Sequence, residues 1–176
     1  MRTVWTLLLV PLGIFAQSAA RAQTGDATRA PAGMVEAATA VGVGVQIYRC
    51  EVKGSNGGWV LVGPEAKLFA PPATSGTPVG THGAGPIWRW SDGSAVIGKG
   101  VAKEPSPNKG SLPWLLLSLS PASDSAAAGK LVGMAYVRRS DTVGGDPPGQ
   151  VCDAAIQGQE TRVDYKALYT FYKPAS

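Results

Sequence analysis

The sequence predicts an all-β protein, a single-domain sandwich or barrel of about eight short antiparallel strands with one disulfide. Segments rich in Val, Ile, Leu, Tyr and Trp alternate with clusters of Gly, Pro, Ser and Asp, a pattern typical of strands joined by turns. The 176 residues include 23 glycines and 14 prolines, which favour many turns. Outside the N-terminal apolar run, no segment holds apolar residues at helical spacing over several turns.

The expected strands are short apolar or alternating runs bounded by turn residues. Residues 34–42 are expected to form at most a short helical turn. Asp92-Gly93 is a two-residue turn signal and predicts the clearest hairpin of the chain, whereas GTHGAGP at 80–86 is expected to be a glycine-shaped loop. Strands are expected at 45–50, 59–63, 67–70, 87–91, 95–101, 114–120, 131–139 and 163–172.

The N-terminus has the three parts of a secretory signal peptide. Arg2 supplies the positive end, an apolar run extends from Val4 to Phe15, and Ala20-Arg21-Ala22 forms a cleavage site before Gln23. The run is shorter than the roughly 20 residues that a membrane span needs. We therefore expect a signal peptide at 1–22, a disordered leader at 23–33 and one domain at 34–176, delivered to the periplasm or the exterior without a membrane anchor.

Both cysteines, Cys50 and Cys152, lie in the part expected to be exported. In an oxidising compartment an even pair without Cys-x-x-Cys spacing typically forms a structural disulfide. The alternative is a pair of free thiols.

The ordered motifs resemble a family of exported bacterial and fungal proteins known only as a domain of unknown function. The resemblance covers nearly the whole mature chain and implies one compact exported domain containing the cysteine pair, without an assigned activity. It is carried by Gly44-Val45-Gln46-x-Tyr48-x-Cys50, Gly80-Thr81-His82-x-x-Gly85-Pro86-x-Trp88, Asp92-Gly93-Ser94, Pro113-Trp114-Leu115-Leu116, Thr142-x-Gly144-Gly145, Cys152 and Tyr165-x-Ala167-x-Tyr169-x-Phe171-Tyr172.

Several classes of function lack their signature. The net charge of +4 is spread along the chain, and without a dense basic stripe no nucleic-acid surface is predicted. There is no G-x-S-x-G nucleophile elbow, and Pro86-Ile87 stands where a phosphate-binding loop needs Lys and Ser or Thr. With a single histidine and the cysteines expected to be oxidised, neither a metal site nor a cofactor is predicted.

His82 is the only histidine of the chain. It is interpreted as a structural tie of the glycine-rich segment, a polar contact in a ligand cleft, or a catalytic or metal-binding group. Catalysis would use a nearby carboxylate, for which Asp92 and Asp141 are the candidates. Trp88 and Trp90 share one face of their strand, and they either pack in the core or form an exposed aromatic strip for sugar rings.

The sequence therefore predicts an exported binding module that holds a carbohydrate, a cell-wall polymer or another extracellular partner through glycine-rich loops. The alternative is a hydrolase that uses His82 with a carboxylate. The candidate ligand-binding residues are His82, Trp88, Trp90, Arg139, Gly144 and Gly145.

Overall fold

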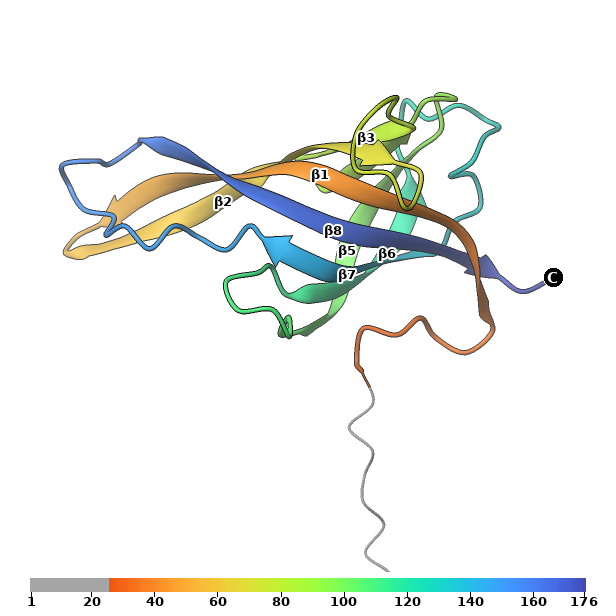
Figure 1. The fold of residues 1–176 in the computed structure, drawn as a ribbon, viewed down its shortest axis with the longest axis horizontal. Helices are drawn as coiled ribbons and strands as arrows, with labels where there is room; N and C mark the ends of the chain where they lie inside the picture. Colours follow the sequence, from red (N-terminus) through yellow and green to blue (C-terminus); the bar gives the residue numbers. More distant parts are fainter. Residues whose placement is uncertain (1–25) are drawn as a thin grey trace, which may run out of the picture.

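A computed structural model describes residues 26–176 of the protein. Eight antiparallel strands form one closed sheet, in which each strand pairs with its neighbours in the chain and the last strand returns to the first (Figure 1). Of the two predicted architectures, the barrel is the one formed, and no helix is present in the described residues. The strands are β1 (Met34–Lys53), β2 (Asn56–Phe69), β3 (Gly80–Gly83), β4 (Ile87–Trp90), β5 (Ala95–Glu104), β6 (Trp114–Pro121), β7 (Tyr136–Gly144) and β8 (Glu160–Pro174).

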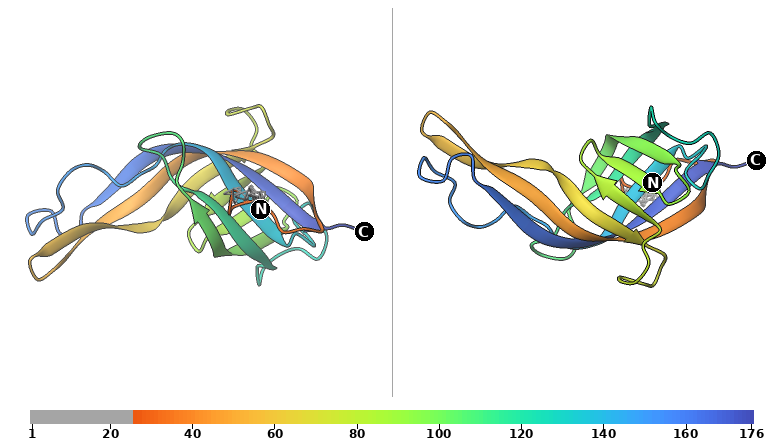
Figure 2. Two further views of the ribbon diagram at one scale, coloured as in Figure 1. Left: turned by 90° about the horizontal axis from the view of Figure 1, so that it is seen from below. Right: turned by 90° about the horizontal axis from the view of Figure 1, so that it is seen from above.

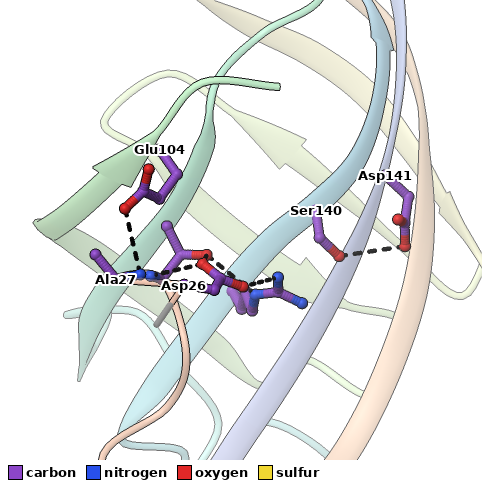
Figure 3. A network of polar contacts seen from close by, with 7 residues as sticks. Asp26, Ala27, Glu104, Ser140 and Asp141 are labelled. Carbon is purple, nitrogen blue, oxygen red and sulfur yellow. Dashed lines mark hydrogen bonds and ion pairs between the residues drawn. The ribbon is translucent and has the colours of Figure 1, made fainter. Parts of the chain in front are cut away.

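The predicted signal peptide at 1–22 and the first residues of the predicted leader lie outside the described residues. Residues 26–33, also expected in the leader, form turns that pack on the barrel (Figure 3). Thr28 is fully buried, and Asp26 forms an ion pair with Arg138 of β7. The backbone N–H of Ala27 donates to Glu104 of β5 at 3.3 Å. This segment therefore bridges two strands of the barrel wall. Among the described residues, no helix is long and apolar enough to cross a membrane.

Residues 34–42 belong to a strand, and the expectation of a short helical turn there is wrong. They pair with β8 from Met34 opposite Pro174 to Gly42 opposite Ala167, with one irregularity between Glu36 and Ala38. The small residues of this segment look weakly strand-forming in isolation. They are needed because large aromatic side chains lie behind them: a Cβ at Gly42 would be 2.5 Å from Cε2 of Tyr169. Packing across the barrel has overridden local propensity.

Residues 80–83 are the second correction, because they form strand β3 rather than part of a loop. β3 lies between β2 and β4, with His82 opposite Ala66 on one side and Trp88 on the other. Only residues 84–86 turn, and Gly85 has a φ of +112°. His82 is therefore fixed on the barrel wall.

Other strand boundaries also differ from those expected. The strands predicted at 59–63 and 67–70 are one strand, β2, whose pairing shifts register near Gly63. The strand predicted at 131–139 begins only at Tyr136, after a turn. The predicted Asp92-Gly93 hairpin is confirmed, but its turn has three residues, 91–93, because the N–H of Trp90 donates to the carbonyl of Ser94. Gly93, with a φ of +85°, takes the left-handed position of this turn type.

The barrel core is built around aromatic side chains. Trp88, Tyr169 and Phe171 are almost fully buried, and Trp88 meets the other two edge to face, with ring centroids 5.6 and 6.1 Å away. Trp90 is half-buried and packs against Phe171. Trp88 therefore packs in the core and is not part of an exposed aromatic strip.

Beyond the barrel, β1 and β2 continue as a long hairpin accompanied by the start of β8 (Figures 1 and 2). We call residues 48–63 the hairpin arm. The predicted disulfide is confirmed: Cys50 in the arm is bonded to Cys152 in the loop before β8. The indole N–H of Trp59 also donates to the carbonyl of Gln150 at 2.8 Å. Both contacts hold the 145–159 loop against the arm.

Candidate functional site

A cavity of about 200 Å³ opens into the barrel beside the base of the hairpin arm. Every strand except β5 contributes to its wall, so the cavity lies inside the closed sheet. Leu61 and Val62 are 50% and 41% exposed and mark its mouth. The lining residues are Gln46, Leu61, Val62, Gly63, Pro64, His82, Gly85, Pro86, Trp88, Leu115, Leu117, Arg139 and Tyr169.

His82 forms part of the cavity wall and is only 4% exposed. Its Nδ1 lies 2.9 Å from the carbonyl oxygen of Ile87. A carbonyl can only accept, so Nδ1 carries the proton and Nε2 is left as an acceptor. Burial lowers the pKa of His82 to about 3, against a smaller opposing effect of the Ile87 carbonyl, and the nearby charge of Arg139 lowers it further. The ring is therefore neutral at ordinary pH.

The aromatic part of the wall is a cluster of three rings. The imidazole of His82 is stacked on the indole of Trp88, which follows from their opposite positions in the β3–β4 pairing. The phenol of Tyr169 meets both rings edge to face, with centroids 5.1 Å from His82 and 5.6 Å from Trp88. Each ring fixes the orientation of the other two, so this wall is preorganised.

Arg139 brings the only charge to the cavity lining. The side chain is half-buried, and its Nε and Nη2 donate to the carbonyl of Pro113 at 3.2 and 2.9 Å. Burial raises the pKa values of Tyr165 and Tyr169, and the charge of Arg139 opposes that rise at both phenols. The positive charge of the guanidinium thus influences buried side chains inside the barrel. Among the described residues it forms no ion pair with a carboxylate.

Two buried hydrogen-bond donors of the lining lack a partner. Within residues 26–176, three buried side-chain nitrogens have none, and two of them are Nε2 of Gln46 and Nε1 of Trp88. The third belongs to Trp114, outside the cavity. Buried donors normally find an acceptor, and leaving one unsatisfied costs about 1–3 kcal/mol. Gln46 and Trp88 both line the cavity, so two side chains with unpartnered donors lie in the same wall.

Asp92, a candidate catalytic carboxylate, serves the β4–β5 turn instead. Its Oδ1 accepts from the backbone N–H and the hydroxyl of Ser94 at 2.9 and 2.6 Å, and its Oδ2 accepts from the N–H of Lys130 at 2.6 Å. These bonds, with the Ser94 hydroxyl the strongest influence, hold the pKa of Asp92 below its usual value. The carboxylate thus joins two loops and does not line the cavity.

Asp141 lies on the outer surface, at the bulge of β7 (Figure 3). Its φ is +49°, and it accepts a hydrogen bond from the hydroxyl of Ser140 at 3.3 Å. In the described part of the chain, no hydrogen bond or ion pair joins His82 to a carboxylate, and no three His, Cys, Asp or Glu side chains gather as metal ligands. The geometry therefore supplies neither an acid–base pair nor a metal centre around the imidazole.

Gly144 and Gly145 take part in structure rather than in the cavity lining. Gly144 exchanges hydrogen bonds with the 111–112 segment, and the carbonyl of Gly145 accepts from the buried hydroxyl of Tyr48 at 2.6 Å. Of the predicted ligand-binding residues, the cavity thus brings together His82, Trp88 and Arg139, and leaves Trp90 and the two glycines elsewhere.

Gln46 is one of the lining residues that sequence reasoning missed. It is 1% exposed, next to Tyr48 and Cys50 on the inward face of β1. A signal was present in the sequence, because residues two apart on a strand share a face. In VQIYRC an amide therefore shares the buried face with Tyr48 and Cys50, and a buried amide requires partners.

Comparison with known proteins gives a family and no relative of known activity. Residues 31–173 match the family model described as "Protein of unknown function (DUF3455)". Neither the curated proteins nor the solved structures contain a match.

Proposed function

The chain belongs to the DUF3455 family, and because that family has no assigned activity, we propose from the geometry of the barrel that this protein is an exported, non-enzymatic binding module for a small molecule. The cavity inside the closed sheet carries this proposal, together with the two unpartnered buried donors in its wall. Eight-stranded barrels are wide enough to hold one small ligand in addition to their own side chains.

The shape of the cavity favours a compact ligand over an extended polymer. It is enclosed by seven strands and measures about 200 Å³. A cell-wall polymer would need an open groove along the surface, whereas a monosaccharide or a molecule of similar size fits within this space. We therefore propose that the ligand binds in the interior of the barrel and not, as expected from the sequence, at the glycine-rich loops.

The lining favours a ligand with an apolar body. Leucine, valine and proline supply six of the thirteen lining residues, and the aromatic ring cluster offers a flat face. Binding pockets for small molecules combine such apolar walls with a few placed polar groups. Here those groups are Gln46, Trp88, His82 and Arg139.

Export is part of the proposal and rests on two supports. The N-terminal sequence has the form of a cleavable signal peptide, and the Cys50–Cys152 disulfide suits an oxidising compartment. A hydrolase remains the second candidate function only by virtue of His82 itself. Its neutral imidazole, held by a backbone carbonyl, has no carboxylate to orient it among the described residues.

The proposal is tested by blocking the mouth of the cavity. Saturation-transfer NMR with indole, phenol, benzoate, hexanoate, glucose and N-acetylglucosamine should show at least one binder to the wild type. Val62→Trp should weaken that binding, because Val62 lines the cavity at its mouth. Val60→Trp is the matched control, on the same strand, 44% exposed and outside the lining. Absence of any binder, or equal effects of the two variants, would overturn the proposal.

A further inference from the structure

The side chains that line the cavity carry positive but no negative charge, and their unpartnered buried atoms are hydrogen-bond donors. The lining contains one arginine and no aspartate or glutamate. Its two unpartnered buried atoms, Nε2 of Gln46 and Nε1 of Trp88, are both donors. A site that offers a cation and free donors without a counter-charge is complementary to an acceptor-rich anion.

The arginine is held in place without being neutralised. Nε and Nη2 of Arg139 both donate to the carbonyl of Pro113, which orients the guanidinium but carries no charge. By contrast, each of the arginines at 49, 89, 138 and 162 forms an ion pair with a carboxylate. Arg139 is therefore the half-buried arginine of the described chain that keeps its charge available to a ligand.

From this arrangement we infer that the ligand is a small organic carboxylate, with the carboxylate directed to Arg139 and the apolar body lying against the ring cluster and the leucines. The inference rests on the proposed function and adds the chemical class of the ligand. Arginine presents several N–H groups in a fixed plane, which suits a carboxylate better than a neutral acceptor. Leu115 and Leu117 lie in the same wall and provide an apolar surface for the rest of the molecule.

His82 takes no part in binding the carboxylate group. Its free Nε2 is an acceptor, so it offers nothing to a carboxylate oxygen and cannot replace the arginine. The neutral ring serves instead as part of the flat apolar wall, stacked on Trp88 at a centroid distance of 4.3 Å. The cavity thus has a cationic, donor-bearing region and an aromatic region, as an amphiphilic acid requires.

Isosteric pairs on the wild-type protein provide the direct test. Isothermal titration at pH 7 compares benzoate with benzamide and hexanoate with hexanamide, which differ in charge and hardly in shape. We expect a carboxylate to bind at least about tenfold more tightly than its amide, equivalent to about 1.4 kcal/mol. If both members of each pair bind equally, or only indole or glucose binds, the carboxylate inference is overturned while the binding function stands. If no probe binds, both fail.

Variants of two adjacent arginines then locate the anion. Arg139→Met should abolish the preference for the acid over its amide, whereas Arg138→Met should leave that ratio unchanged. Arg138 is the matched control because it pairs with Asp26 and lies over the ring of Trp114, outside the cavity lining. Trp88→Phe, which removes the indole donor and keeps an aromatic ring, provides a second variant if Arg139→Met does not fold. A weaker preference in Trp88→Phe supports the site, and an unchanged preference in the folded variants contradicts it.

Discussion

The imidazole of His82 lies flat on the indole of Trp88, with ring centroids 4.3 Å apart and ring planes inclined by 11°. The two residues face each other across the β3–β4 pairing, and both are buried. A histidine in this position is held as an aromatic, uncharged group. Because of this contact, the imidazole forms part of the apolar cavity wall. Its burial there also makes the stability of the protein depend on pH.

Acid should destabilise the protein through His82. Burial lowers its pKa from 6.5 to about 3, so between these values the unfolded chain binds a proton that the folded chain refuses. The contribution of the neutral His82 to the free energy of unfolding is complete above pH 6.5 and is lost as the pH falls toward 3. Between pH 6 and pH 4.5 we expect the free energy of unfolding to fall by about 1.4 kcal/mol per pH unit. Urea unfolding at several pH values measures this slope, and His82→Phe should remove it. A wild type of constant stability over this range would contradict the burial of the neutral ring.

Reduction of the disulfide should destabilise the protein strongly. Cys50 and Cys152 are separated by 102 positions, and a loop of that length corresponds to about 4–5 kcal/mol in the chain-entropy model. Denaturant unfolding with and without dithiothreitol measures the loss. In the Cys50→Ser, Cys152→Ser double variant, dithiothreitol should have no further effect. A difference below about 1 kcal/mol would mean that the loop before β8 is held mainly by other contacts.

Gly44 should not tolerate a side chain. A Cβ at this position would lie 2.1 Å from the carbonyl oxygen of Glu65, which is backbone of the adjacent strand and cannot move without breaking the β1–β2 pairing. We expect Gly44→Ala to cost about 3 kcal/mol or more, or to prevent folding. Gly100→Ala, where no atom lies within 4 Å, is the matched control and should change stability by less than about 0.5 kcal/mol. Thermal unfolding of the two variants compares them.

Asp92→Ala should lower the thermal unfolding midpoint and leave ligand binding intact. The substitution removes the acceptor for Ser94 and for the N–H of Lys130, which together join the β4–β5 turn to the 129–131 segment. Asp92→Asn retains part of this bonding and should fall between the wild type and alanine. The measurements are the unfolding midpoint and the affinity for a probe that binds the wild type. Loss of binding with an unchanged unfolding midpoint would contradict this structural role and would mean that Asp92 takes part in ligand binding.

The strands could be predicted from the sequence where their signal is local. The alternation at 45–50 and 163–172, and the Asp-Gly turn after 87–91, depend on neighbouring residues, and the structure places strands there. Residues 34–42 and 80–83 escaped prediction because alanines and glycines favour strands poorly on their own. They are strands because β8 and β4 pair with them and large rings fill the space that small residues leave.

The candidate site could be predicted only in part. His82 is a candidate by residue type, because it is the sole histidine of the chain. Gln46 and Tyr169 join His82 in the cavity wall only because the barrel closes, which brings β1 and β8 into the same wall. That closure depends on pairing between the two ends of the domain, and a single sequence contains no local signal for such a register. For the same reason the sequence left sandwich and barrel as alternatives.

The pairing of β1 with β8 also means that the sheet can close only after the last strand has been synthesised. β1 is made first and has one of its two partners at once, in β2, but the other edge of β1 remains open until the last strand has emerged. Contacts between distant parts of a chain form slowly, since the intervening segment must first be ordered. A nascent chain therefore exposes one edge of β1 until β8 has emerged. A chain that ends before Glu160 has no strand to close the ring, and one that ends before Tyr169 lacks part of the cavity wall.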